Sequence, residues 1–118
     1  MSKRYWKFLV EDILGSIEKI EEYVGSKDFD KFKENNLIID GVVRNLQIIG
    51  EASKNIPEKI KKKYNGIKWR HIVGLRNRIV HEYFGVDLKI IWVIIKQEIP
   101  DFEEQIKTIL KEEKKKNS

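Results

Sequence analysis

The sequence contains no cysteine, only two prolines and no long apolar run. Without cysteine, disulfide bonds and thiolate metal sites are excluded. A membrane-spanning helix needs about 20 consecutive apolar residues, and no segment of this chain approaches that length. The opening residues, MSKRYWKFLVED, turn acidic too early for the apolar region of a signal peptide. We therefore expect a cytoplasmic protein with no membrane partner.

Charge is abundant: 36% of the 118 residues are charged, and the net charge is +5. A chain of this length predicts a single domain over residues 1–118. Residues 112–118 read as a frayed, charged tail. The basic excess is compatible with an anionic partner such as RNA but does not require one, because phosphate binding depends on clustered charge.

Apolar residues spaced three and four apart predict an amphipathic helix over residues 4–24, ended by Gly25. Residues 36–55 predict a second long helix. Its apolar face is broad, which indicates burial on two sides, against the core and, as one option, against a second subunit.

The rest of the chain also has helical signals. A third helix should begin near Pro57, and a fourth should run from about residue 69 to near residue 81. Asp87 can cap the next helix. The run IIWVII at 90–95 is read as a buried helix because no partner strand is in sight, and Ile99-Pro100 should break or kink it. The prediction is an all-α, up-and-down bundle of about five helices.

The stretch LRNRIVHEYFG, residues 75–85, places costly polar side chains among apolar ones. At about 100° per residue, an uninterrupted helix gathers one set of side chains in a broad sector. His71 and Arg78 fall on the opposite side. The members of the sector are Arg70, Arg76, Asn77, His81 and Tyr83.

These residue types suit chemistry on a phosphodiester. Metal-free RNA cleavage needs a base for the 2′-hydroxyl, an acid for the leaving oxygen and positive charge for the phosphorane. His81 titrates near neutrality, and the guanidinium of Arg76 can stabilise developing phosphate charge. Asn77 can orient the imidazole or the substrate. Tyr83 can bond a phosphate oxygen or stack on a base.

No metal or cofactor is predicted, because the two histidines lie on opposite faces and no carboxylate pair has ligand spacing. Phosphate-binding loops of the GxxxxGK[ST] and GxGxxG types are absent. A serine-based triad stays open, although no serine context suggests one.

On pattern alone, capping and salt bridging explain an Arg-Asn-His cluster at a helix end more often than catalysis does. The basic run at 59–64 reads as a solvated helix face, and the aromatics Tyr5, Trp6, Trp69 and Trp92 as core or interface packing. A polar stripe on the second helix is either its solvent edge or the surface that orders Arg76. It consists of Asp40, Arg44, Gln47 and Glu51.

Residues 76–83, RNRIVHEY, match the R-x4-H-x-Y signature of the HEPN superfamily. With the flanking GLRN and HEYFG and the segment IIGEASK, nearly the whole chain resembles HepT-type proteins, the toxin half of a toxin–antitoxin pair. The resemblance implies an all-helical homodimer whose two motifs line one cleft. It also implies metal-independent endoribonuclease activity on tRNA or mRNA.

Carried over by the motif, Arg76 and His81 are the implied catalytic pair, and Asn77 supports them. Arg70, which shares their sector of the predicted helix, is a candidate RNA contact. Tyr83 matches the tyrosine to which the cognate antitoxin, a minimal nucleotidyltransferase, adds AMP. Two other interpretations remain: a non-catalytic HEPN module that binds nucleotide or RNA, and a structural partner subunit of a nucleotidyltransferase.

Overall fold

The computed structural model describes residues 3–79 and 87–116. Within these two ranges no strand occurs, which confirms the predicted all-α class. Residues 75–79 are helical and are called here the 75–79 helix. The other helices are α1 (Lys3–Val24), α2 (Phe29–Glu34), α3 (Asn36–Lys54), α4 (Glu58–Lys63), α5 (Trp69–Val73), α7 (Leu88–Val93), the π-helix η1 (Ile94–Glu98) and α8 (Ile99–Lys116).

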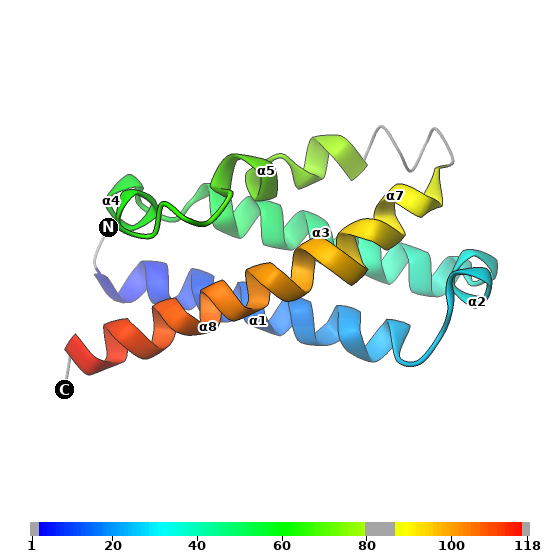
Figure 1. Ribbon diagram of the computed structural model, residues 1–118, viewed down its shortest axis with the longest axis horizontal. Coiled ribbons are helices and arrows are strands. Elements are labelled where there is room, and N and C mark those ends of the chain that lie inside the picture. Colours follow the sequence, from blue (N-terminus) through cyan, green and yellow to red (C-terminus); the bar gives the residue numbers. More distant parts are fainter. Residues whose placement is uncertain (1–2, 80–86, 117–118) are drawn as a thin grey trace.

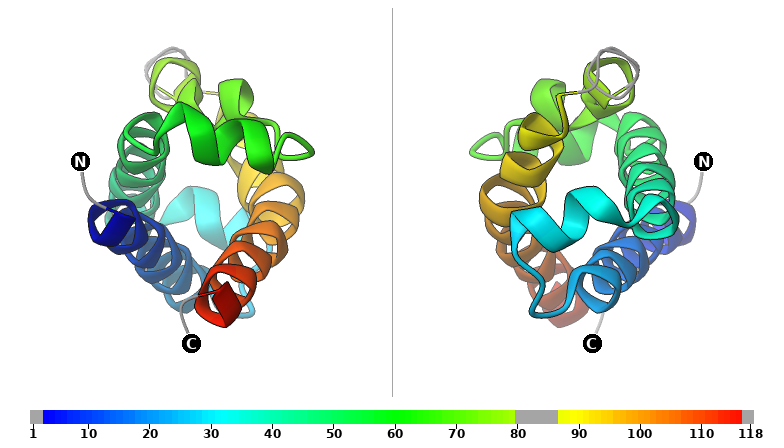
Figure 2. Two further views of the ribbon diagram at one scale, coloured as in Figure 1. Left: turned by 90° about the vertical axis from the view of Figure 1, so that its left-hand side faces the viewer. Right: turned by 90° about the vertical axis from the view of Figure 1, so that its right-hand side faces the viewer.

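Three long rods set the shape of the molecule. Helix α1 runs along the bundle, α3 returns beside it, and α7, η1 and α8 form a third rod that crosses α1 (Figure 1). Viewed from the end, the rods surround one core, with α4 and α5 covering the remaining side (Figure 2). The Cα atoms extend 47 × 26 × 21 Å along the principal axes. The up-and-down arrangement is therefore as predicted.

Helix α1 follows the predicted amphipathic pattern. Val10, Ile13 and Ile17 are fully buried in the core. The helix ends where predicted, because Gly25 adopts a positive φ of 53° that side chains disfavour. The Gly25 N–H donates to the carbonyl of Glu21 at 2.8 Å. The pattern and its stop signal together placed this helix correctly.

Helix α3 is buried on two sides, and both neighbours belong to the same chain. It packs along α1 on one side and against α5 on the other. The predicted broad apolar face is thus accounted for within this chain, and burial against a second subunit stays a prediction. Leu37 is an exception, since 83% of it is exposed. The buried apolar residues are Ile39, Val42, Val43, Leu46, Ile49 and Ala52.

The third rod corrects one expectation and confirms another. Residues 90–95 are helical as predicted, and the Asp87 carboxylate caps their helix by accepting from the Lys89 N–H at 3.1 Å. Of the break or kink expected at Ile99-Pro100, the break does not occur, because the chain stays helical from Leu88 to Lys116, but the regular α-helix is interrupted by the π-helix η1 directly before Ile99. A proline ring clashes with the carbonyl four residues earlier in a regular α-helix. That carbonyl belongs to Lys96, in the wider turn of η1.

The single helix predicted from residue 69 to near residue 81 is interrupted. Helix α5 ends at Gly74, whose N–H donates to the Arg70 carbonyl at 3.0 Å. The 75–79 helix then begins, and its Arg78 N–H donates to the Gly74 carbonyl at 3.0 Å. Glycine is a poor helix former, which explains a turn at this position. The expected helix end near residue 81 lies outside the described residues.

The C-terminal part of α8 is attached to α4. The Glu113 carboxylate accepts from Lys63 Nζ at 2.7 Å and from Tyr64 Oη at 2.8 Å. Burial, together with the hydrogen bond to Glu113, raises the pKa of Tyr64. The expected charged tail begins within this helix, which the structure follows to Lys116.

No helix in the described ranges is long and apolar enough to cross a membrane.

The close approach of two backbones at Gly50 generates a prediction. A Cβ added there would meet the carbonyl oxygens of Ile72 at 3.4 Å and Val73 at 3.5 Å, which is ordinary contact. We expect Gly50→Ala to retain the fold. Gly50→Leu should lower the free energy of unfolding by about 1–3 kcal/mol, because the larger side chain must push α5 away from α3. Urea unfolding of both variants checks this, and equal stability of the Leu variant and the native protein would contradict it.

Candidate active site

The structure describes three of the five predicted site residues. Arg76 and Asn77 lie on the 75–79 helix, and Arg70 lies on α5. His81 and Tyr83 lie outside the described residues. The site is therefore built from the helix that immediately precedes them and from the surfaces on its two sides.

Arg76 is exposed and lies over the polar stripe of α3. Its Nη1 atom is 3.0 Å from Glu51 Oε1, and the two side chains are 63% and 49% exposed. Arg44, Gln47 and Glu51 from α3 line a groove of about 570 Å³ together with Arg76, and Leu9 and Asp12 of α1 form its other side. We call this the Arg76 groove. Glu51 of the stripe thus contacts Arg76, as the second of its two interpretations expected, while Asp40, Arg44 and Glu51 are also exposed to solvent, as the first expected.

The ion pair between Arg76 and Glu51 is a weak tether. Exposed pairs of this kind contribute about 0–1 kcal/mol, because solvent screens them and both side chains lose rotational freedom. Arg76 is consequently held near α3 but can be released at low cost. Asn77, its neighbour on the 75–79 helix, is also exposed.

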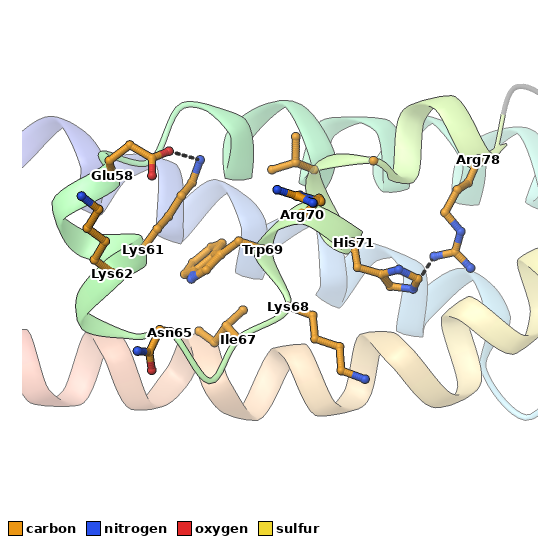
Figure 3. A pocket seen from close by; sticks show the side chains of 12 residues that line it. Glu58, Lys61, Lys62, Asn65, Ile67, Lys68, Trp69, Arg70, His71 and Arg78 are labelled. Carbon is orange, nitrogen blue, oxygen red and sulfur yellow. Dashed lines mark hydrogen bonds and ion pairs between the residues drawn. The ribbon is translucent and has the colours of Figure 1, made fainter.

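Arg70 is not part of the Arg76 groove. It lines a different hollow, with His71, Arg78 and residues of α4. An uninterrupted helix would place Arg70 in the sector of Arg76, as predicted, but the turn at Gly74 separates the two. The same helix would group His71 with Arg78 on the opposite side. That grouping is confirmed, because Arg78 Nη1 lies 2.7 Å from His71 Nε2 (Figure 3).

Glu98 on η1 completes this opposite side, and the sequence analysis missed it. Arg78 donates to both of its carboxylate oxygens, at 3.0 Å and 3.2 Å. His71 Nε2 lies 2.6 Å from the same carboxylate. A protonated Nε2 donates to Glu98, whereas a deprotonated one accepts from Arg78. We call these three residues the Glu98 cluster. No local sequence pattern predicts this cluster, because Glu98 and Arg78 are 20 positions apart in the chain.

Opposing effects act on the Glu98 carboxyl group. Burial by itself raises the pKa, but the hydrogen bonds and charge of Arg78, with a contribution from His71, hold the pKa of Glu98 below its usual range. The ionised carboxylate therefore joins α5, the 75–79 helix and η1. Because Arg78 is two residues beyond Arg76, the cluster also fixes the helix that carries Arg76.

Within the ranges that the structure describes, no group of three or more His, Asp and Glu side chains is arranged to hold a metal ion. The described part of the site consists of an exposed arginine over a groove and a helix held on its other side by Glu98. In the sequence, the motif continues to His81 and Tyr83.

Comparison with known protein families assigns the chain. Residues 13–109 match the family described as Ribonuclease HepT-like. The chain belongs to the HepT-like ribonuclease family. The matched region contains the α3 stripe, the R-x4-H-x-Y motif and the Glu98 cluster, whereas Leu9 and Asp12 of the Arg76 groove precede it.

Relatives agree with this assignment. A protein of Caldanaerobacter subterraneus named "Putative RNase" is 42% identical over 89% of this chain and 94% of its own length. "Probable ribonuclease HepT" of Thermococcus cleftensis is 38% identical over 92% of this chain and 99% of its own length. A "Gamma-glutamylcyclotransferase and putative RNase" of Methanocaldococcus jannaschii is 42% identical over 95% of this chain, which spans only 51% of that relative. No solved structure matches the chain.

The lowered pKa of Glu98 predicts a pH-dependent contribution to stability. A carboxyl group whose pKa is lower in the folded state stabilises that state above its unfolded pKa, here about 4.5. This stabilisation is lost as the pH falls through the folded value. We expect Glu98→Gln to lower the free energy of unfolding by about 1 kcal/mol at pH 7.

Urea unfolding at pH 7 and at pH 3 measures this effect, and the difference between Glu98→Gln and the native protein should shrink at the lower pH. Glu104→Gln is the control, because Glu104 is an exposed carboxylate on the neighbouring turn of α8. A constant difference at both pH values would show that the ionised carboxylate of Glu98 does not stabilise the fold.

Proposed function

We propose that this HepT-like protein is a metal-independent endoribonuclease that cleaves tRNA or mRNA in the cytoplasm. The observation that carries the proposal is Arg76, the first residue of the R-x4-H-x-Y motif. Its guanidinium is exposed over a groove and held only by the weak pair with Glu51. Family membership supports the same reaction class.

The reaction needs a base, an acid and a phosphate ligand. His81 takes the proton of the 2′-hydroxyl as the 2′-oxygen attacks the phosphorus atom, or gives a proton to the departing 5′-oxygen. The P–O bond to the 5′-oxygen breaks, which leaves a cyclic phosphate on one fragment and a 5′-hydroxyl on the other. Arg76 leaves Glu51 to bind the phosphorane oxygens, and Asn77 supports His81.

The proposed active species is a homodimer in which two motifs share one cleft. Apolar side chains that a monomer leaves in water support this, because Tyr5 is 44% exposed and Phe8 is 58% exposed. Both lie on the part of α1 whose Leu9 and Asp12 line the Arg76 groove. A second copy packed on this part of α1 would bury these rings and bring its own motif toward Arg76.

The proposed biological role is that of the toxin in a toxin–antitoxin pair. Its antitoxin is a minimal nucleotidyltransferase that adds AMP from ATP to Tyr83. The phosphate ester would place an anion on the residue seven positions beyond Arg76, and this anion can replace Glu51 as the partner of the guanidinium. The adenosine would fill the cleft that RNA needs, so inhibition requires no change of fold.

The first test is cleavage of total tRNA in EDTA by the native protein, Arg76→Ala and His81→Ala. We expect cleavage by the native protein and a loss of at least about 100-fold in each variant, because each removes a group that acts on the reacting phosphate. The free energy of unfolding should stay within about 1 kcal/mol, since the pair between Arg76 and Glu51 is exposed. Lys19→Ala, which changes an exposed residue of α1 away from both grooves, is the control and should retain cleavage.

Each other outcome has its own meaning. No cleavage by native protein whose Tyr83 is unmodified by mass spectrometry would favour the non-catalytic RNA-binding module. Variants that chiefly weaken the dimer would favour the structural subunit. Equal cleavage by native protein and both variants would place the chemistry elsewhere.

The modification account predicts that Tyr83→Phe escapes control, because phenylalanine has no oxygen to accept AMP. With catalytic amounts of the nucleotidyltransferase and ATP, the native protein should gain the mass of one AMP group and lose cleavage. Tyr83→Phe should gain no mass and stay active. Tyr64→Phe serves as the control and should be silenced like the native protein. Silencing of Tyr83→Phe under these conditions would refute the account.

A further inference from the structure

A second groove lies on the other side of the 75–79 helix from the Arg76 groove. It has a volume of about 900 Å³ and runs between α4 and α5, from Lys62 and Glu58 at one end to Arg78 at the other (Figure 3). We call it the basic groove. Its charged and titratable lining consists of Lys61, Lys62, Lys68, Arg70, His71 and Arg78, with Glu58 as the one acidic member.

Three of these cations are uncompensated. Lys61 is 3.8 Å from Glu58, and Arg78 is bound by Glu98. Lys62, Lys68 and Arg70 are exposed and form no ion pair within residues 3–79 and 87–116. Unpaired like charges that lie close together do not stabilise the fold. Their positive potential attracts an external anion.

The fold creates this concentration of charge. The sequence analysis read the basic run at 59–64 as a solvated helix face. In the structure, Lys61 and Lys62 from that run face the same hollow as Lys68 and Arg70, which follow the turn at residues 64–67. Helix α4 and the segment that leads from Lys68 into α5 thus line one groove with their cations, which a single solvated face does not do.

We propose that the basic groove binds the phosphate backbone of the RNA substrate outside the cleavage site. The proposal rests on the ribonuclease function given above and adds a binding surface to it. Arg78, at one end of the groove, is two residues from Arg76 on the same helix. A strand held by Lys62, Lys68 and Arg70 is therefore led toward the helix that begins the motif.

The apolar floor favours phosphate contacts over base stacking. Trp69 lines the groove but is only 8% exposed. Its indole N–H donates to the Tyr64 carbonyl at 3.1 Å, and its ring packs edge-on against Phe102 with centroids 6.1 Å apart. The indole has no open face for a base. Backbone contacts without base contacts position RNA but carry no sequence preference.

An acidic protein is the rival occupant, and the lining argues against it. Protein interfaces derive most of their affinity from apolar or aromatic anchors inserted into central pockets. Of the apolar side chains here, Ile67 and Trp69 are already buried by the chain itself, and only Val73 is half-buried. Exposed cations spread along a groove suit a linear polyanion with regularly spaced charges.

The test measures binding of a 20-nucleotide 2′-O-methyl RNA, which lacks the 2′-hydroxyl needed for cleavage. Lys62→Glu/Lys68→Glu is compared with Lys19→Glu/Lys31→Glu, whose two lysines are exposed on α1 and α2. Both doubles change the net charge equally, so only the position differs. We expect the groove double to bind at least about 10-fold more weakly at 0.1 M salt, with a salt slope flatter by about 1.4. The control should lose much less affinity.

Cleavage separates this inference from the proposed function. If the protein is a nuclease, the groove double should cleave a four-nucleotide RNA at the native rate and long RNA with a raised KM. If it cleaves nothing, the binding comparison still decides the inference. Equal weakening in both doubles, or unchanged binding in the groove double, would overturn it.

Two further measurements keep the test decisive. Lys62→Gln/Lys68→Gln removes charge without reversing it and should show a smaller loss in the same direction, which matters if the glutamate variant folds poorly. Polyglutamate of equal charge is added as a competitor. Competition as strong as that of RNA, lost in the groove double, would assign the groove to an acidic protein and overturn the RNA assignment.

Discussion

The structure depends on the close packing of α5 and the start of the 75–79 helix against α3. At Gly50 the two backbones approach so closely that a single added carbon would reach contact distance of Ile72 and Val73. A methyl group fits between the two segments at this point, but a larger side chain does not. The polar side chains of α5 and the 75–79 helix therefore extend to the two sides of this contact. Arg76 extends toward α1 and α3, and Arg78 and His71 extend toward η1. The Arg76 groove and the basic groove lie on these two flanks.

The two arginines on these flanks are held with very different strength. Arg78 makes two hydrogen bonds to Glu98, and the pair is 33% and 24% exposed. Arg76 makes one contact to Glu51, and both partners are largely in solvent. Hydrogen bonds to a partly buried carboxylate are stronger than exposed ion pairs. The 75–79 helix is thus held on the side of Arg78, while Arg76 on its other side can move to a ligand.

The π-helix contributes to the same arrangement. Its extra residue per turn accommodates Pro100 and allows the rod to continue into α8. Glu98 is the last residue of this segment, and its side chain reaches both Arg78 and His71. Segments of π-helix are frequent at functional sites, and this one carries the carboxylate that orients the motif helix.

Much of the fold followed from the sequence because local signals and tertiary contacts agree. The spacing of Ile13 and Ile17, the stop at Gly25 and the cap at Asp87 depend on neighbours within one or two turns. The interruption at Gly74 was missed because a periodic pattern does not report a one-residue turn. The continuous rod through Pro100 was missed for a related reason, since the π-turn that accommodates the proline has no sequence signature.

The candidate site, like the fold, could be predicted from the sequence only where its residues are close together in the chain. The motif residues Arg76 and His81 could be named from the sequence because they are close together in it. Glu98 could not, because its partner Arg78 is 20 positions away and only the packing of η1 on the 75–79 helix joins them. The basic groove was hidden for the same reason. A run of lysines looks alike whether it faces open solvent or a hollow shared with another helix.

The weak tether of Arg76 also determines how substrate and modification relate. A phosphate, either in RNA or in an AMP ester on Tyr83, offers the guanidinium a doubly charge-assisted contact that an exposed glutamate matches poorly. In the proposed function both ligands draw Arg76 away from Glu51. An anion attached to the chain has a high effective concentration, whereas RNA must diffuse in. The proposed ester on Tyr83 would therefore compete with RNA for Arg76 without a change of fold.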